Sequence, residues 1–239
     1  MSKSTGDPER MSKRVVGIVV SALVVVAALG VVGGRQWGSV STPSTSAKTT
    51  TTLGTTTQPE TAIWPFTSTV TRFGDPVLAA QAFATAYLGF VNPIMGAFEQ
   101  GDSRSGEVLV RATPNGPATT IMVRQLTPAN SWWVLGASCP DIIVTAPSLS
   151  GRISSPVVVQ GRSTAYEAVV NVELLQDGTL APLKTDTVMG GSMGFMGPFK
   201  KSILFASPSS RAGALSFRTI SPKDGHVIEA SVIRVTFLK

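Results

Sequence analysis

The pattern of hydrophobic and polar positions changes four times along the chain, and each pattern predicts a different kind of structure. Residues 15–34 form an apolar run without a charge, whereas residues 1–14 hold four basic side chains. About 20 apolar residues in a helix span a bilayer core of roughly 30 Å. The run therefore predicts a transmembrane helix. Residues 1–14 form its cytoplasmic basic segment, because positive charge gathers on the cytoplasmic side.

A cleavable signal peptide is the competing interpretation of this run. Ala28 and Gly30 form a loose small-x-small cleavage site. The run is longer than the apolar core of about 7–15 residues that signal peptides usually have. We favour an uncleaved, single-pass anchor in the cell membrane, with the N-terminus cytoplasmic and the C-terminal domains extracytoplasmic.

Residues 35–62 are rich in Thr and Ser, contain scattered Pro and have few large apolar side chains. Such a segment buries too little apolar surface to offset the entropy lost on ordering. We therefore expect a disordered linker, a stalk that holds the folded part clear of the membrane.

Residues 63–140 combine a helical pattern with strand-like runs. Asp75 is a good N-cap for a helix over residues 74–90, and Pro76 suits its first position. The apolar face of this helix is formed by Ala80, Phe83, Tyr87 and Phe90. Three strand-like runs follow, separated by turn residues, at 106–112, 119–126 and 131–138. The pattern predicts a small α+β domain, one helix on an antiparallel sheet.

Residues 141–239 consist of strand and turn patterns only. Alternation over residues 166–175 predicts one strand, with Tyr166, Ala168, Val170, Val172 and Leu174 on one face and Glu167 and Glu173 on the solvent face. About seven short strands in roughly 100 residues are typical of an immunoglobulin-like sandwich. The predicted fold class is therefore mainly β: a C-terminal sandwich preceded by a small α+β unit.

The net charge of +6 over 239 residues does not indicate nucleic-acid binding. Proteins of that class concentrate basic charge on one face, whereas here the largest basic cluster after the anchor is Lys200-Lys201. The single cysteine, Cys139, has no partner for an internal disulfide. We expect it to be a small buried residue rather than a reactive thiol.

No residue set supports catalysis, a metal or a cofactor. His226 is the only histidine, so a Cys/His zinc cluster cannot be assembled. Glu167 and Glu173 lie six residues apart on one predicted strand, about 20 Å. The two carboxyl groups of a glycosidase lie about 5–9.5 Å apart. We expect these glutamates to have no catalytic role.

Three features are candidates for partner binding. In the glycine-rich stretch 189–199, Met193, Phe195 and Met196 provide an adaptable apolar surface, unless the loop folds over the open end of the sandwich and hides them. Trp132 and Trp133 alternate, so one belongs to the core. Trp133 is the candidate exposed platform, unless it covers the helix or the domain junction. Arg111 and Arg124, on adjacent predicted strands, suggest a clamp for an anionic ligand, although exposed sheet arginines are commoner.

The C-terminal region resembles the immunoglobulin-like domain of bacterial spore germination proteins over residues 141–239. The motifs that carry the resemblance are SSPVVVQGRSTAYEAVVNVEL (154–174), GPFKKSILF (197–205), SPKDG (221–225) and IRVTF (233–237). The resemblance implies a β-sandwich in an envelope protein, with a role in binding or assembly rather than catalysis.

These observations together predict a non-enzymatic, membrane-anchored envelope protein. Its extracytoplasmic domain would bind an envelope protein or a cell-wall polymer. The alternative is an extracytoplasmic hydrolase with its site in the α+β unit, assembled from Asp102, Glu107, Arg111 and Arg124.

Overall fold

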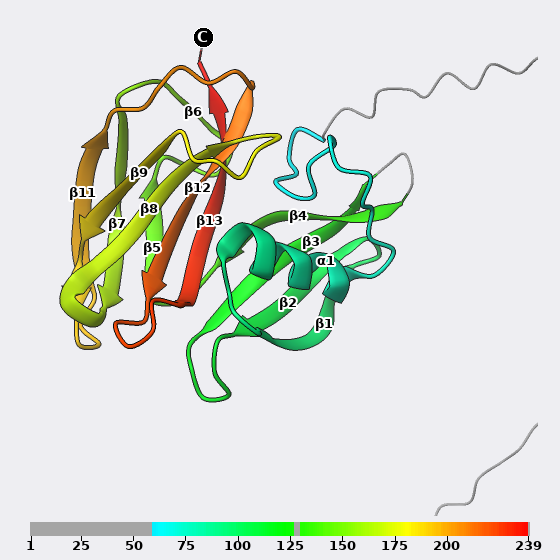
Figure 1. Cartoon of the computed structure of the whole chain (residues 1–239), viewed down its shortest axis with the longest axis horizontal. Coiled ribbons are helices and arrows are strands. Elements are labelled where there is room, and N and C mark those ends of the chain that lie inside the picture. Colours follow the sequence, from blue (N-terminus) through cyan, green and yellow to red (C-terminus); the bar gives the residue numbers. More distant parts are fainter. Residues whose placement is uncertain (1–58, 127–129, 239) are drawn as a thin grey trace, which may run out of the picture. The chain divides into compact units, whose positions relative to one another are not determined.

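The computed structural model describes residues 59–126 and 130–238 (Figure 1). As predicted, the fold is mainly β, with one small helix. No helix in these two ranges is long and apolar enough to cross a membrane. The predicted transmembrane helix at 15–34, and the predicted linker as far as residue 58, lie outside them.

The helix begins where the sequence predicts. The Asp75 Oδ1 atom accepts a hydrogen bond of 2.9 Å from the Leu78 amide, and Pro76 is the first residue of α1 (Pro76–Ala82). The chain continues as the π-helical η1 (Phe83–Leu88) and leaves the helix at Gly89, whose φ is +85°. The predicted end at residue 90 is therefore late, because glycine readily adopts the left-handed conformation that stops a helix. The predicted apolar face is buried.

The helix packs on a sheet of four antiparallel strands. Their bounds are β1 (Ile94–Asp102), β2 (Ser105–Arg111), β3 (Ala118–Leu126) and β4 (Ser131–Ser138). Strands β2 to β4 match the three predicted runs. Val108, Ile121 and Val134 face α1 in the core of this part, and α1 contacts all four strands. Side chains on the other face, such as Glu107, are exposed.

The remaining strands form a sandwich of two sheets. One sheet contains β13 (Val227–Phe237), β12 (Ala212–Ile220), β8 (Val169–Gln176) and β9 (Lys184–Met189), with β6 (Gly151–Ile153) parallel to β13. The other contains β5 (Ile142–Ala146), β7 (Val157–Ala165) and β11 (Gly197–Ile203), with the two-residue β10 (Gly191–Ser192) parallel to β7. Alternate residues from both sheets, including Val159, Phe199 and Phe217, fill a core between them. This is an immunoglobulin-like arrangement.

The single strand predicted over residues 166–175 is wrong. A short helical corner, η2 (Tyr166–Ala168), ends β7 and begins β8, and these two strands belong to different sheets. Glu167 and Ala168 have φ values of +58° and +63°. Apolar alternation continues on both sides of the corner, and for that reason the sequence pattern conceals it.

Strand β13 joins the sandwich to the four-stranded sheet. One edge of β13 pairs with β12, while the other meets β4 at Val232 and Ala137 and β6 at residues 235–237. Two residues before the β4 contact, the Ala230 amide donates a 3.0 Å hydrogen bond to the Thr119 hydroxyl of β3. A nine-stranded sheet thus crosses the boundary predicted at residues 140 and 141.

Glu173 supports this junction instead of facing solvent as predicted. Its carboxylate forms an ion pair with Arg218, and both side chains are largely buried. Arg218 also donates a 3.1 Å hydrogen bond from Nη1 to the carbonyl of Leu88, the last helical residue. Cations are favourable at the C-terminal end of a helix, where carbonyl groups lack partners within the helix. The carboxylate therefore positions an arginine that caps the helix.

Arg234 of β13 holds a second buried ion pair. The guanidinium contacts both carboxylate oxygens of Asp177 in the turn after β8, and Nη2 lies 2.7 Å from Oδ2. Its Nε donates a 2.9 Å hydrogen bond to the Glu60 carbonyl. Arg234 is 3% exposed. One side chain thus ties together β13, a turn of the sandwich and the segment that precedes the helix.

We predict that Arg234→Met lowers the free energy of unfolding by about 3–5 kcal/mol. Methionine keeps the apolar stem but leaves the Asp177 carboxylate buried without its partner. Lys201→Met, which breaks the more exposed Lys201–Asp186 pair, is the matched control and should cost at most about 1 kcal/mol. Urea denaturation of both variants measures the difference. Equal losses would show that the Arg234 pair contributes no more than a surface ion pair.

Candidate functional site

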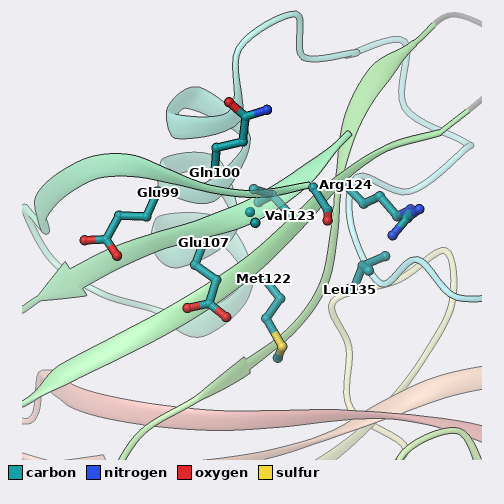
Figure 2. Close-up of a pocket in the computed structure, with 10 residues that line it drawn as sticks. Glu99, Gln100, Glu107, Met122, Val123, Arg124 and Leu135 are labelled. Carbon is teal, nitrogen blue, oxygen red and sulfur yellow. The ribbon is translucent and has the colours of Figure 1, made fainter. Parts of the chain in front are cut away.

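The exposed face of the four-stranded sheet carries a shallow pocket of about 410 Å³ (Figure 2). Glu99 on β1 lies directly opposite Glu107 on β2, and Met122 on β3 is the next cross-strand neighbour. Figure 2 shows both carboxylates on one side of the pocket and the Arg124 guanidinium pointing away from them. The pocket offers acidic side chains on an open surface.

The residues predicted as raw material for a hydrolase are not gathered in this pocket. Asp102 forms an exposed ion pair with Arg124 at 3.5 Å. Hydrogen bonds from the Arg104 amide and the Ser105 hydroxyl, with the Arg124 charge, lower the pKa of Asp102. Arg111 donates a hydrogen bond to the Gly116 carbonyl at the far end of β2. Of the predicted set, only Glu107 and Arg124 line the pocket.

The predicted clamp of Arg111 and Arg124 is wrong. Arg124 pairs with Ser105 at the start of β2, whereas Arg111 at its end pairs with Ala118. Six residues of extended chain separate the two positions, which is about 20 Å. Adjacent strands bring two residues together only when their register agrees, and the sequence did not reveal the register.

The interpretation of Trp133 as an exposed platform is also wrong, and the alternative that it is covered agrees better with the structure. Trp132 packs in the core under the helix, and Trp133 on the other face is 1% exposed. Its indole Nε1 donates to the Ser131 hydroxyl at 3.2 Å, and the Arg72 guanidinium covers the ring at 5.2 Å from its centroid. Segment 64–73 lies along β4 through the Trp64–Val134 and Phe73–Trp132 bridges. Trp133 is therefore not accessible to a partner.

A second pocket is lined by residues from η2, from the loop before β11 and from the ends of β12 and β13 that flank their turn. The loop before β11 and the β12–β13 turn lie at the same end of the sandwich (Figure 1). The volume of the pocket is about 320 Å³. We call it the Glu229 pocket and define it by its lining residues: Asp141, Thr164, Ala165, Tyr166, Val169, Met193, Gly194, Met196, Thr219, Ile220, Ile228 and Glu229. Two of the predicted binding residues, Met193 and Met196, line it together with two acidic residues, Asp141 and Glu229.

The loop over residues 190–196 is fastened to the rim of this pocket. Its short strand β10 pairs with the end of β7, and the Gly194 amide donates a 3.0 Å hydrogen bond to the Thr164 hydroxyl. Arg162 donates a 3.0 Å hydrogen bond to the Met196 carbonyl. A Cβ atom on Gly191 would collide with the Phe195 carbonyl, so the loop closes tightly on itself. These contacts fix the loop backbone.

The loop nevertheless presents apolar side chains to solvent. Met193 is 75% and Phe195 80% exposed, and Tyr166 on the neighbouring corner is 60% exposed. Met196 is half-buried in the pocket wall. The alternative that the loop folds inward and hides these residues is therefore wrong for Met193 and Phe195.

Glu229 lies at the inner end of the pocket. It is 3% exposed, and its Oε1 accepts a 3.2 Å hydrogen bond from the Thr219 hydroxyl. Burial, followed by the charge of Asp141, raises the pKa of Glu229 to about 7, against a smaller opposing effect of Cys139 and Thr219. The buried carboxyl thus changes charge near neutral pH.

Cys139 is the small buried residue that the sequence predicts. Its Sγ lies 3.4 Å from the Ser231 hydroxyl, and burial raises the pKa of the thiol far above its usual value. A thiolate, not a thiol, is the reactive form of cysteine. Cys139 therefore lies beside Glu229 without offering a nucleophile.

Asp141, Tyr166 and Glu229 are site residues that the sequence analysis missed. The available signal was the one acidic residue in the apolar run VIEASVIRV of β13. An acid at an inward position of a buried strand is unusual and indicates either a buried partner or a functional role.

Comparisons with known proteins agree with part of this fold. Residues 141–226 match the family described as the immunoglobulin-like domain of bacterial spore germination. The predicted resemblance is thereby confirmed for this region, which includes every lining residue of the Glu229 pocket except Ile228 and Glu229. No curated protein and no solved structure matches the chain.

We expect the parent chain to become less stable as the pH rises from 4.5 to 7, because Glu229 ionises less readily in the folded state. We predict that Glu229→Gln does not show this decrease. The pKa of Glu229 is about 7 in the folded state and 4.5 ordinarily. Below pH 4.5 both states hold the proton. Between pH 4.5 and 7 the unfolded chain releases it more readily, so folding becomes less favourable by about 3 kcal/mol in total.

Urea denaturation at pH 4.5 and pH 7.5 tests this prediction. The advantage of Glu229→Gln over the parent chain should grow by up to about 3 kcal/mol between the two pH values. Glu107→Gln, which neutralises an exposed carboxyl, controls for the change in net charge. A difference between parent and Glu229→Gln that stays constant with pH would contradict the prediction.

Proposed function

We propose that this chain is a non-enzymatic envelope protein whose immunoglobulin-like domain binds a protein or cell-wall partner outside the membrane. The observation that carries the proposal is the loop over residues 190–196. Its backbone is fixed, yet it holds Met193 and Phe195 in solvent next to Tyr166. Single exposed apolar residues are ordinary, but clusters of them are typical of interaction sites.

The conformation of Met193 supports this proposal. Met193 and Gly194 have φ values of +54° and +83°, and the Phe195 amide donates a 2.9 Å hydrogen bond to the Ser192 carbonyl. Turns with two such residues favour Asn-Gly. A methionine in this conformation costs about 1 kcal/mol or more. Because the Met193 side chain is exposed, packing within the chain does not offset this free energy. A contact with a partner would offset it.

Strained backbone gathers at the same end of the sandwich. Glu167 and Ala168 in the corner next to Tyr166 also have positive φ, and the Gly190 amide donates a 3.0 Å hydrogen bond to the Ala168 carbonyl. Strain of this kind concentrates at binding sites, where the surrounding structure holds it in place. The loop and the corner therefore form a preorganised surface, which loses little conformational entropy when a partner binds.

The location in the proposal rests on the sequence. The apolar run 15–34 and its flanking charges favour a single-pass anchor. The Thr/Ser-rich segment after it favours a stalk as far as residue 58, because Glu60 and Ala62 are held against the folded part. A membrane helix, a stalk and a folded domain in this order are compatible with a tethered binding module.

The hydrolase alternative has weaker support. Arg111 is far from the pocket of Figure 2, and Arg124 is paired with Asp102. A reaction there would depend on Glu99 and Glu107, two exposed acids on an open surface from which the Arg124 guanidinium points away. We therefore place the function at the other pocket.

Met193→Asn tests the proposal because it separates folding from binding. Asparagine suits the left-handed turn, so the variant should be more stable than the parent chain by about 1 kcal/mol. It removes the apolar contact, so sedimentation of the full chain with isolated cell walls, or its cross-linking to a partner in intact cells, should fall at least about tenfold.

Two further variants complete the test. Phe195→Ser should reduce the same binding, whereas Leu204→Ser removes an equally exposed apolar side chain beyond the opposite end of β11 and should leave binding unchanged. Binding that survives both loop variants would show that this surface does not serve the proposed function.

The anchor has its own test. Deletion of residues 15–34 should move the chain from the membrane fraction, where alkaline carbonate does not extract it, to the soluble fraction. The intact mass of the mature protein should include residues 1–34. A mass that begins after Gly30 would establish the signal-peptide interpretation instead.

A further inference from the structure

Glu229 keeps one carboxylate oxygen without a strong hydrogen-bond donor. Oε1 is bonded to Thr219, whereas Oε2 is buried and has, among the described residues, at most the weak donor of the Cys139 thiol beside it. Leaving a buried polar group unpaired costs about 1–3 kcal/mol, and more if the group is charged. Glu229 lines the pocket, so a donor that enters it and displaces the side chains covering Oε2 would remove this cost.

The charges around the pocket favour a cation. Its lining holds two carboxylates, Asp141 and Glu229, and no lysine, arginine or histidine. Of the other titratable groups, the Cys139 thiol lies beside Glu229, and the exposed Tyr166 lines the pocket. Arg162, which holds the Met196 carbonyl, is outside the lining. The negative potential therefore has no counter-charge within the pocket.

The walls of the pocket are apolar. Met193 and Met196 stand on the loop side, and Ile220 and Ile228 on the side of the β12–β13 turn. Apolar walls around a carboxylate suit a side chain with an aliphatic stem and a charged end. Methionine side chains adapt their shape to such a stem.

Lysine fits the free acceptors better than arginine. A guanidinium binds best to two free carboxylate oxygens side by side, but one oxygen of Glu229 is already bonded to Thr219. An ammonium group is a compact charge with three donors in a tetrahedral arrangement. It would place one donor on Glu229 Oε2 and leave others for Asp141 and for the Thr164 hydroxyl, both of which line the pocket.

We infer that the Glu229 pocket receives a lysine side chain of a protein partner whose surface packs on Met193, Phe195 and Tyr166. This inference rests on the proposed binding function and names the chemistry that the site recognises. Aromatic and methionine side chains are enriched in protein–protein interfaces. The exposed rim therefore favours a protein over a wall polymer as the source of the ammonium group.

Methionine-methyl NMR of the full chain in detergent micelles tests the inference. The probe is the peptide acetyl-Ala-Lys-Ala-amide, and acetyl-Ala-norleucine-Ala-amide is the matched probe without the charge. At pH 8 the lysine peptide should shift the methyl signals of Met193 and Met196, while Met122 in the other pocket stays unchanged. The norleucine and arginine peptides should bind at least about tenfold more weakly.

The pH dependence is a second readout. A pKa of about 7 leaves roughly a tenth of Glu229 ionised at pH 6 and nine tenths at pH 8. The lysine peptide should therefore bind about tenfold more tightly at pH 8. Glu229→Gln should lose both the affinity and its pH dependence, whereas Glu107→Gln should bind as the parent chain does.

Several results of the peptide experiment would overturn the inference. They are no shift of the Met193 or Met196 signals at high peptide concentration, equal binding of the lysine and norleucine peptides, and unchanged binding of the lysine peptide to Glu229→Gln. A response to amino-bearing wall fragments but not to the lysine peptide would overturn it in favour of a wall ligand.

Partner binding in cells separates the inference from the proposed function. If Phe195→Ser abolishes this binding while Glu229→Gln does not, the inference fails and the proposed function stands. If neither variant weakens that binding, both fail.

Discussion

The arrangement of this molecule depends on the pairing of β13 along both of its edges. One edge completes a sheet of the sandwich with β12, and the other meets β4 at Val232 and β6 near the C-terminal end of the strand. This pairing fixes the register of the strand. Register in turn decides that Glu229 and Arg234 enter buried positions, because a shift of one residue would turn each to the other face.

The two buried ionisable residues of β13, Arg234 and Glu229, have different surroundings. Arg234 has a carboxylate and two carbonyls around it, so its charge is compensated and the pair ties three segments together. Glu229 has one hydroxyl and, beside it, a second acid. Compensation explains why the arginine is tolerated in the interior. Glu229 has no positively charged partner, so its burial lowers the stability of the fold. We therefore attribute this carboxyl to binding rather than to folding.

The sequence predicts features that depend on neighbouring residues and misses those that depend on register or on the path between sheets. The start of the helix follows from Asp75 and Pro76 alone, and three strands of the first sheet follow from alternation. Strand β1 was missed because it lies at an edge and its side chains are mostly exposed, so its pattern is weak. The sequence leaves open whether Trp133 is exposed, and it wrongly suggests the arginine clamp, because burial by segment 64–73 and the register of β2 with β3 are not local properties.

The same reasoning explains why the candidate site was only half predicted. Met193, Phe195 and Met196 were found from residue type within one loop, whereas Asp141, Tyr166 and Glu229 come from three other segments that only the sandwich brings together. A glycine-rich loop suggested a flexible surface, yet its glycines permit close backbone contacts that fix it. In the proposed function, this fixed backbone limits the conformational entropy that is lost when a partner binds.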